Sequence, residues 1–151
     1  MEQVAREDTA LALVELDRQE CLELLGHAGV ARVVLSVGGL PVALPVNVSV
    51  LDGDVVFATD KGSKLDAAVR GQVVSVEADG VDRLYHAGWS VLVTGVAQLL
   101  TEARDVERAG PLPLGTWAPG PHPFLVRVPS TVVSGRRISW SGPVPEVRTR
   151  P

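Results

Sequence analysis

Hydrophobic and polar residues follow two different periods along the chain. Between Asp17 and Gly29, apolar residues recur every three or four positions, which is typical of an amphipathic helix. Asp17 followed three residues later by Glu20 matches a capping box, and Gly29 is a typical helix end. After Gly29 the texture changes to β-branched runs separated by glycine, proline and aspartate, which predicts that most of the chain is β-structure.

The runs that predict strands are separated by turn signals. Pro41 and Pro45 fall inside the second run and must lie at an edge, a strand start or a bulge, because proline donates no ladder hydrogen bond. Asp52 and Gly53 predict a type I′ hairpin turn, since both residue types tolerate positive φ. The predicted strands are residues 30–37, 40–51, 54–59, 73–79, 89–100, 124–133 and 134–140.

Short helices are expected near residues 63–71 and 101–109, and irregular loops at 80–88 and 110–123. His86, in the first of these loops, is a candidate for lining a substrate cleft. Neighbouring strands are joined by turns or a single short helix, which favours a mainly β, largely antiparallel barrel or sandwich. We expect about six or seven strands and two or three short helices. The expected organisation is an N-terminal arm (1–15), one domain (16–141) and a Pro/Arg tail (142–151).

Composition narrows the class of protein. The 151 residues are 46% hydrophobic and suit one domain with its own core. A formal net charge of −4 gives no basic footprint for nucleic acid or an anionic membrane. A single cysteine, Cys21, excludes a disulfide framework, and the three histidines lack metal-ligand spacing, so no metal site is expected. No run spans a bilayer, and the acidic first ten residues are unlike a secretory signal. We therefore expect a soluble, cytoplasmic protein.

The strongest candidate for ligand chemistry is the stretch of residues 57–65. Both lysines of the chain, Lys61 and Lys64, lie in it, together with the hydroxyls of Thr59 and Ser63. A strand, a glycine-bearing turn and the start of a helix follow one another here, and a helix N-terminus suits an anion such as phosphate. The alternative is a solvated turn with surface lysines and a capping serine.

Several short motifs occur in a characteristic order and spacing. They read LPVN at 44–47, DG at 52–53, VFAT at 56–59, GSKL at 62–65 and GWSVLVTG at 88–95. From Asp17 to residues 135–138, this order resembles the pyridoxamine 5′-phosphate oxidase-like flavin-binding split-barrel family.

The resemblance implies a split β-barrel homodimer with a flavin, usually FMN, in each of two clefts between the subunits. It places the flavin phosphate at the third strand and the following turn, the ring beside the backbone of the second strand, and a polar side chain at the ring's edge. The residues carried over onto this chain are Val46, Asn47, Ala58, Thr59, Lys61, Ser63, Lys64, Trp89 and Ser90. Arg32 is either a further phosphate contact or a charge on the solvent face of a strand.

The departures from the family pattern limit the activity that the resemblance implies. The vitamin-processing members carry an arginine on the second strand, where this chain reads LPVN, so oxidation of pyridoxamine phosphate is not expected. The first hypothesis is an FMN-dependent oxidoreductase acting on an unknown small molecule. A deazaflavin enzyme, with Arg136 and Arg137 receiving an anionic tail, and a non-catalytic flavin-binding or storage protein are the alternatives. The partner subunit is expected to cover outward faces of residues 40–51 and 89–100.

Overall fold

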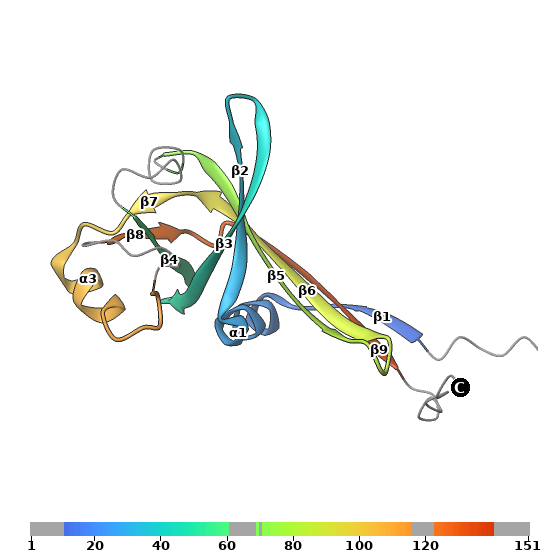
Figure 1. Cartoon of the computed structure of the whole chain (residues 1–151). Coiled ribbons are helices and arrows are strands. Elements are labelled where there is room, and N and C mark those ends of the chain that lie inside the picture. Colours follow the sequence, from blue (N-terminus) through green and yellow to red (C-terminus); the bar gives the residue numbers. More distant parts are fainter. Residues whose placement is uncertain (1–10, 61–68, 70, 116–122, 141–151) are drawn as a thin grey trace, which may run out of the picture.

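A computed structural model describes residues 11–60, 69, 71–115 and 123–140. Within them, nine antiparallel strands form one continuous sheet in the order β1-β9-β6-β5-β2-β3-β4-β8-β7 (Figure 1). The elements are β1 (Leu11–Glu15), α1 (Arg18–Ala28), β2 (Val30–Val37), β3 (Leu40–Leu51), β4 (Asp54–Asp60), β5 (Val73–Asp82), β6 (Ala87–Val96), β7 (Gln98–Leu99), α3 (Ala103–Ala109), β8 (Pro123–Val128) and β9 (Val132–Trp140). The predicted fold class is confirmed, with more strands than expected.

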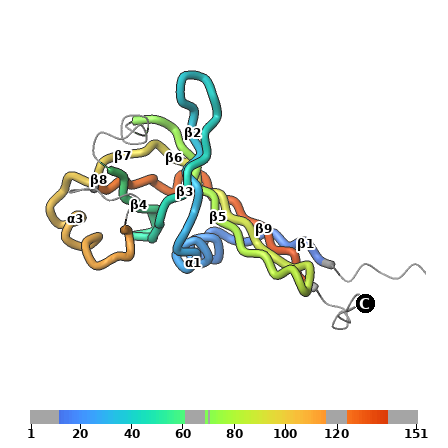
Figure 2. Tube along the Cα trace, in the orientation of Figure 1, coloured from blue at the N-terminus to red at the C-terminus, as the bar shows by residue number. Residues whose placement is uncertain are grey.

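The sheet curls into a barrel at one end and extends as an arm at the other (Figures 1 and 2). β2 pairs with β5 only from Arg32 to Val34, so the β2–β3 hairpin and the β5–β6 hairpin diverge beyond that short contact. The arm consists of β5 and β6 together with β9 and β1. One face of the arm near the barrel packs against α1, and the opposite face carries no helix (Figure 1).

The core is built by alternate residues of the strands, as the period of two predicts. Phe57 is its largest fully buried side chain, and α1 closes the core with Cys21 and Leu25. The other fully buried members are mostly valine, whose branched side chains pack well on a pleated surface. They include Val33, Val48, Val55, Val74, Val76, Val91, Val93 and Val126.

Three local signals in the sequence are confirmed. Asp17 and Glu20 form a reciprocal capping box, with the Asp17 carboxylate accepting from the Glu20 N–H at 2.9 Å, and Gly29 ends α1 with a φ of 71°. Asp52 and Gly53 both have positive φ, at 52° and 79°, in the turn between β3 and β4. These turn and cap residues fix where each element ends.

The prolines of β3 occupy an edge, as expected. β3 pairs with β2 over residues 40–47 and with β4 over residues 48–51, so its first half has a neighbour on one side. Pro41 and Pro45 lie in that half, opposite Ser36 and Arg32. The missing N–H groups therefore leave the β3–β4 ladder intact.

Three boundaries differ from the sequence prediction. Residues 80–88 were expected to form a loop, but β5 runs to Asp82 and β6 begins at Ala87, so most of this stretch is a hairpin. The predicted break between residues 133 and 134 lies instead at residues 129–131, where Pro129 cannot continue a ladder. The expected strand 89–100 is divided into β6 and β7 at Ala97. The helix expected at 63–71 falls almost entirely outside the described residues.

A second, smaller cluster lies on the outer face of the β3–β4–β8 part of the sheet. Leu51, Val56 and Ala58 pack there against Ala109 of α3 and Leu114. Two arginine–aspartate pairs hold α3 in place. Arg127 of β8 lies 3.2 Å from Asp105, and the Arg108 guanidinium donates two hydrogen bonds to the Asp52 carboxylate at 2.5 and 2.7 Å.

The Arg108–Asp52 pair predicts a small, pH-dependent contribution to stability. The hydrogen bonds from Arg108 lower the pKa of the Asp52 carboxyl, so the contribution is complete above the unfolded pKa of about 3.9 and is lost as pH falls through the lower folded pKa. Thermal unfolding should show Arg108→Gln less stable than the wild type at pH 7, with the difference shrinking near pH 2 and in 1 M salt. Adding Asp52→Asn, which keeps the turn, should have little further effect; a fully additive double variant would contradict the pairing.

Candidate functional site

The predicted phosphate-side residues lie in the last part of β4 and in the segment that follows it. Thr59 is 2% exposed, and its hydroxyl donates to the Asp60 carbonyl at 3.3 Å. Ala58, on the opposite side of the strand, is buried in the smaller cluster. Lys61, Ser63 and Lys64 lie outside the described residues. One carboxylate oxygen of Asp60, the last residue of β4, is buried and has no hydrogen-bond partner among the described residues.

The two predicted residues of β3 face opposite ways. Val46 is buried in the main core, so only its backbone is available at the strand's outer surface. Asn47 faces the other side, and its amide nitrogen donates to the Gly115 carbonyl. Asn47 thereby links β3 to the segment that follows α3 and covers the smaller cluster.

Trp89 and Ser90 are consecutive on β6 and so point to opposite faces of the arm. The Trp89 indole covers Gly80: a Cβ built on Gly80 would lie 2.5 Å from the indole nitrogen. Ser90 is exposed on the other face, where it lies between Asp79 of β5 and Arg136 of β9 in the ladder. The sequence did not predict the row Asp79–Ser90–Arg136, because residues 80–88 were expected to form a loop. The neighbours of Ser90 follow only from the register of the β5–β6 hairpin and of β9.

Among the described residues, a single protomer does not bring Ala58 and Thr59 together with Trp89 and Ser90. In the sheet, β4 and β6 are separated by β3, β2 and β5. The cavity that contains Trp89 and Ser90 is lined by residues of the arm alone. The predicted cofactor site is therefore split between the barrel end and the arm.

Arg32 lies on the solvent face of β2 and is already paired. Its guanidinium is 3.1 Å from the Glu77 carboxylate and 3.8 Å from that of Asp79, both on β5. The structure favours the interpretation of Arg32 as a charged surface residue over that of a phosphate contact, because the neighbouring carboxylates would repel an anion there.

The arm's helix-free side, which we call the open face, is unusually apolar for a surface. By register it is formed by the side chains of β2, β5, β6, β9 and β1 that point away from α1. The exposed apolar residues of this face lie on both sides of a polar row, Glu15–Arg136–Ser90–Asp79, and their number indicates an interaction surface. They include Leu13 (64% exposed), Val30, Val34, Val81 (72%), Leu92 (39%), Val132 and Ile138.

Cys21 and His27 make contacts that give them structural roles. Cys21 of α1 is fully buried against Gly135 of β9, and burial raises the pKa of its thiol. The His27 ring contacts the Glu23 carbonyl at 2.7 Å in the last turn of α1. No group of three potential metal-binding side chains gathers among the described residues. In the same part of the chain, neither helix has the length and apolarity to cross a bilayer.

The comparison with known families agrees with this architecture. Residues 17–137 match the pyridoxamine 5′-phosphate oxidase family. The chain belongs to this family. Among curated members of similar sequence, it is 37% identical over 139 residues to the uncharacterized protein Rv0080 of Mycobacterium tuberculosis, covering 89% of this chain and 91% of that protein.

Solved structures extend the comparison. The FAD binding protein from Mycobacterium smegmatis is 33% identical, with a TM-score of 0.75 over 84% of this chain and 99% of that one. A conserved protein of unknown function from Corynebacterium diphtheriae is 26% identical, with a TM-score of 0.68 over 85% of this chain and 98% of that one. This pyridoxamine 5′-phosphate oxidase family member thus has the split-barrel fold that its motifs indicated.

Proposed function

We propose that this protein binds a flavin nucleotide between two copies of the chain and uses it for oxidoreduction of a small molecule. The observation that carries the proposal is the division of the predicted site. Thr59 lies at the end of β4 and the lysine-bearing segment follows that strand, whereas Trp89 and Ser90 lie on the arm, and the open face exposes apolar side chains. A second subunit would cover the open face. The barrel end of one subunit would then meet the arm of the other, so that each site contains both halves.

The residues present suit a flavin. Ser90 offers a hydroxyl without a protein partner among the described residues, exposed on the open face, where it can reach the edge of a ring. The backbone of β3 at Val46 offers hydrogen-bonding groups to the flavin ring. Lys61 and Lys64 supply positive charge for the flavin phosphate. When bound, the flavin supplies the hydride-transfer chemistry. The chain's own residues bind it, orient it and exclude water from it.

The identity of the nucleotide is a finer part of the proposal. FMN and FAD share the phosphate that the lysine segment would hold, and the similar M. smegmatis protein is described as FAD binding. A deazaflavin remains the second candidate, because Arg136 and Arg137 form no ion pair within the described chain and could receive an anionic tail. An absorbance spectrum of the purified protein, followed by titration with FMN, FAD and a deazaflavin, distinguishes the three.

Lys64→Ala tests the phosphate assignment. Loss of one charge-assisted contact should weaken FMN binding by about 1.5–3 kcal/mol, roughly ten- to a hundredfold. Riboflavin, which has no phosphate, should bind the variant and the wild type equally. Arg104→Ala, which removes an exposed cation on α3, serves as the control for a general charge effect. Equal loss for FMN and riboflavin, or no loss for either, would remove Lys64 from the phosphate site.

A further inference from the structure

The open face carries a trough at the free end of the arm. The trough has a volume of about 660 Å³ and is lined by residues of β1, β5, β6 and β9 and by the turn between β5 and β6. Its floor is one cross-strand row that the register defines, running Leu13, Ile138, Gly88, Val81. Because Gly88 has no side chain, the middle of the floor is open between apolar walls.

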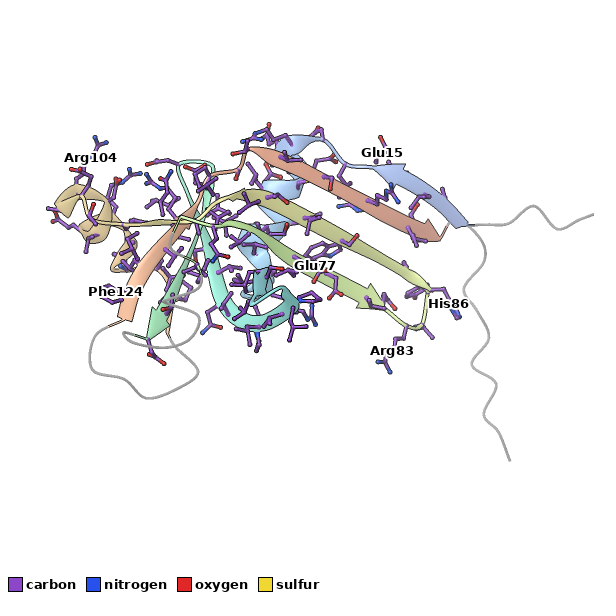
Figure 3. All side chains as sticks on the ribbon, turned by 90° about the horizontal axis from the view of Figure 1, so that it is seen from above. Glu15, Glu77, Arg83, His86, Arg104 and Phe124 are labelled. Atoms are coloured by element: carbon purple, nitrogen blue, oxygen red, sulfur yellow. The ribbon has the colours of Figure 1, made fainter. Side chains whose placement is uncertain are left out.

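Charged groups lie at both ends of this apolar floor. At the inner end, the next row along the strands places Arg136 beside Ser90 and Asp79. At the outer end, Arg83 and His86 belong to the β5–β6 turn, at the tip of the arm (Figure 3). With a rise of about 3.3 Å per residue, the two ends are roughly 13 Å apart.

The acidic groups of the trough are already engaged. One carboxylate oxygen of Asp82 accepts hydrogen bonds from the backbone N–H groups of Leu84 and Tyr85, at 3.0 and 3.2 Å, and so holds the turn. The Asp79 carboxylate lies 3.8 Å from the Arg32 guanidinium.

The basic groups of the trough are not engaged. Neither Arg83 nor Arg136 makes an ion pair or hydrogen bond within the described chain. Glu15 lies opposite Arg136 in the β1–β9 ladder, but no ion pair joins them. Two arginines with unused donors therefore flank the apolar floor, and the two carboxylates that also line the trough, those of Asp79 and Asp82, each have a partner.

We propose that this trough binds a flat, apolar molecule that carries an anionic group, with its body on the Gly88 floor and its charge at Arg136 or Arg83. Guanidinium forks suit carboxylates, sulfonates and phosphates, and the apolar rows suit an aromatic or alicyclic body. Binding at the trough follows from these residues alone. Its use as the site of the second reactant rests on the proposed function, because the inner end of the trough is Ser90.

The probe pair for the test is 8-anilinonaphthalene-1-sulfonate and its uncharged counterpart N-phenyl-1-naphthylamine. Loss of the arginine that holds the charge, by Arg136→Gln or by Arg83→Gln, should weaken binding of the sulfonate by about three- to tenfold, and neither variant should change binding of the neutral amine. Arg104→Gln is the control: Arg104 is an exposed arginine of α3 that makes no ion pair within the described chain and does not line the trough. It should change neither affinity.

Each outcome decides between the possibilities. Equal sulfonate affinity in the Arg136, Arg83 and Arg104 variants would show only general apolar binding and overturn the proposal. A substitution that weakened the sulfonate and the neutral amine equally would overturn it as well. No binding to the wild-type protein would also overturn it, by showing that the trough is closed. Flavin titration of the same proteins separates this result from the proposed function: a protein that binds flavin but shows no arginine dependence loses only the trough assignment.

Discussion

Gly95→Ala is expected to destabilise the protein severely, by roughly 3 kcal/mol or more. Gly95 is buried in β6 where the chain following β8 crosses it, and a Cβ built there would lie 2.0 Å from the carbonyl oxygen of Pro129. The obstructing atom belongs to the backbone at the junction of β8 and β9, so a side-chain rotation cannot relieve the clash. One of the two strands must move, and the core residues on either side of Gly95 move with it.

Urea denaturation monitored by tryptophan fluorescence would measure the effect. The matched control is Gly115→Ala, because a Cβ built on Gly115 meets nothing within 4 Å. The control should change the free energy of unfolding by no more than about 0.5 kcal/mol. A Gly95→Ala protein as stable as the control would mean that the β6 crossing is looser than the structure indicates.

Local signals in the sequence predicted much of the fold. Each confirmed feature has a cause within a few residues: the capping box at Asp17 and Glu20, and the positive-φ turn at Asp52 and Gly53. The error at residues 80–88 arose because glycine there allows close approach of the neighbouring strand. Gly80 and Gly88 read as loop residues, yet Gly80 accommodates the Trp89 indole, and a Cβ at Gly88 would lie 2.7 Å from the Gly80 carbonyl oxygen. A glycine that allows two strands to approach closely cannot be distinguished from a glycine in a turn unless the strand register is known.

The candidate site could be predicted only in part for the same reason. Motifs identified individual residues such as Asn47 and Ser90. The row Asp79–Ser90–Arg136, in contrast, depends on the pairing of three strands, and its two end residues lie 57 positions apart in the sequence. The ion pair of Arg32 with Glu77 likewise requires the β2–β5 register. Apolar and polar residues alternate within residues 73–82 and 87–96, which indicates two strands. Their register would have followed only from a hairpin turn placed at residues 83–86.

Leu92→Glu is expected to separate the proposed dimer and to abolish flavin retention with it. Leu92 lies on the open face in a cross-strand row with Ser134 on one side and Glu77 on the other. A new carboxylate there would be buried against the partner without a counter-charge and next to Glu77, which itself is paired with Arg32. An unpaired buried charge costs about 3–5 kcal/mol, so the dissociation constant of the dimer should rise by at least about a hundredfold.

Light scattering at micromolar concentration and the flavin absorbance of the same samples measure the two effects together. Val106→Glu is the matched control, because Val106 of α3 is 41% exposed, close to the 39% of Leu92, and lies away from the open face. The control should remain dimeric and retain flavin. If Leu92→Glu becomes monomeric but still holds the flavin, one subunit suffices for the cofactor and the divided site is wrong. If it stays dimeric, the partner covers a different surface. Only simultaneous loss links the apolar open face to cofactor binding, since that outcome requires the second subunit to complete the site.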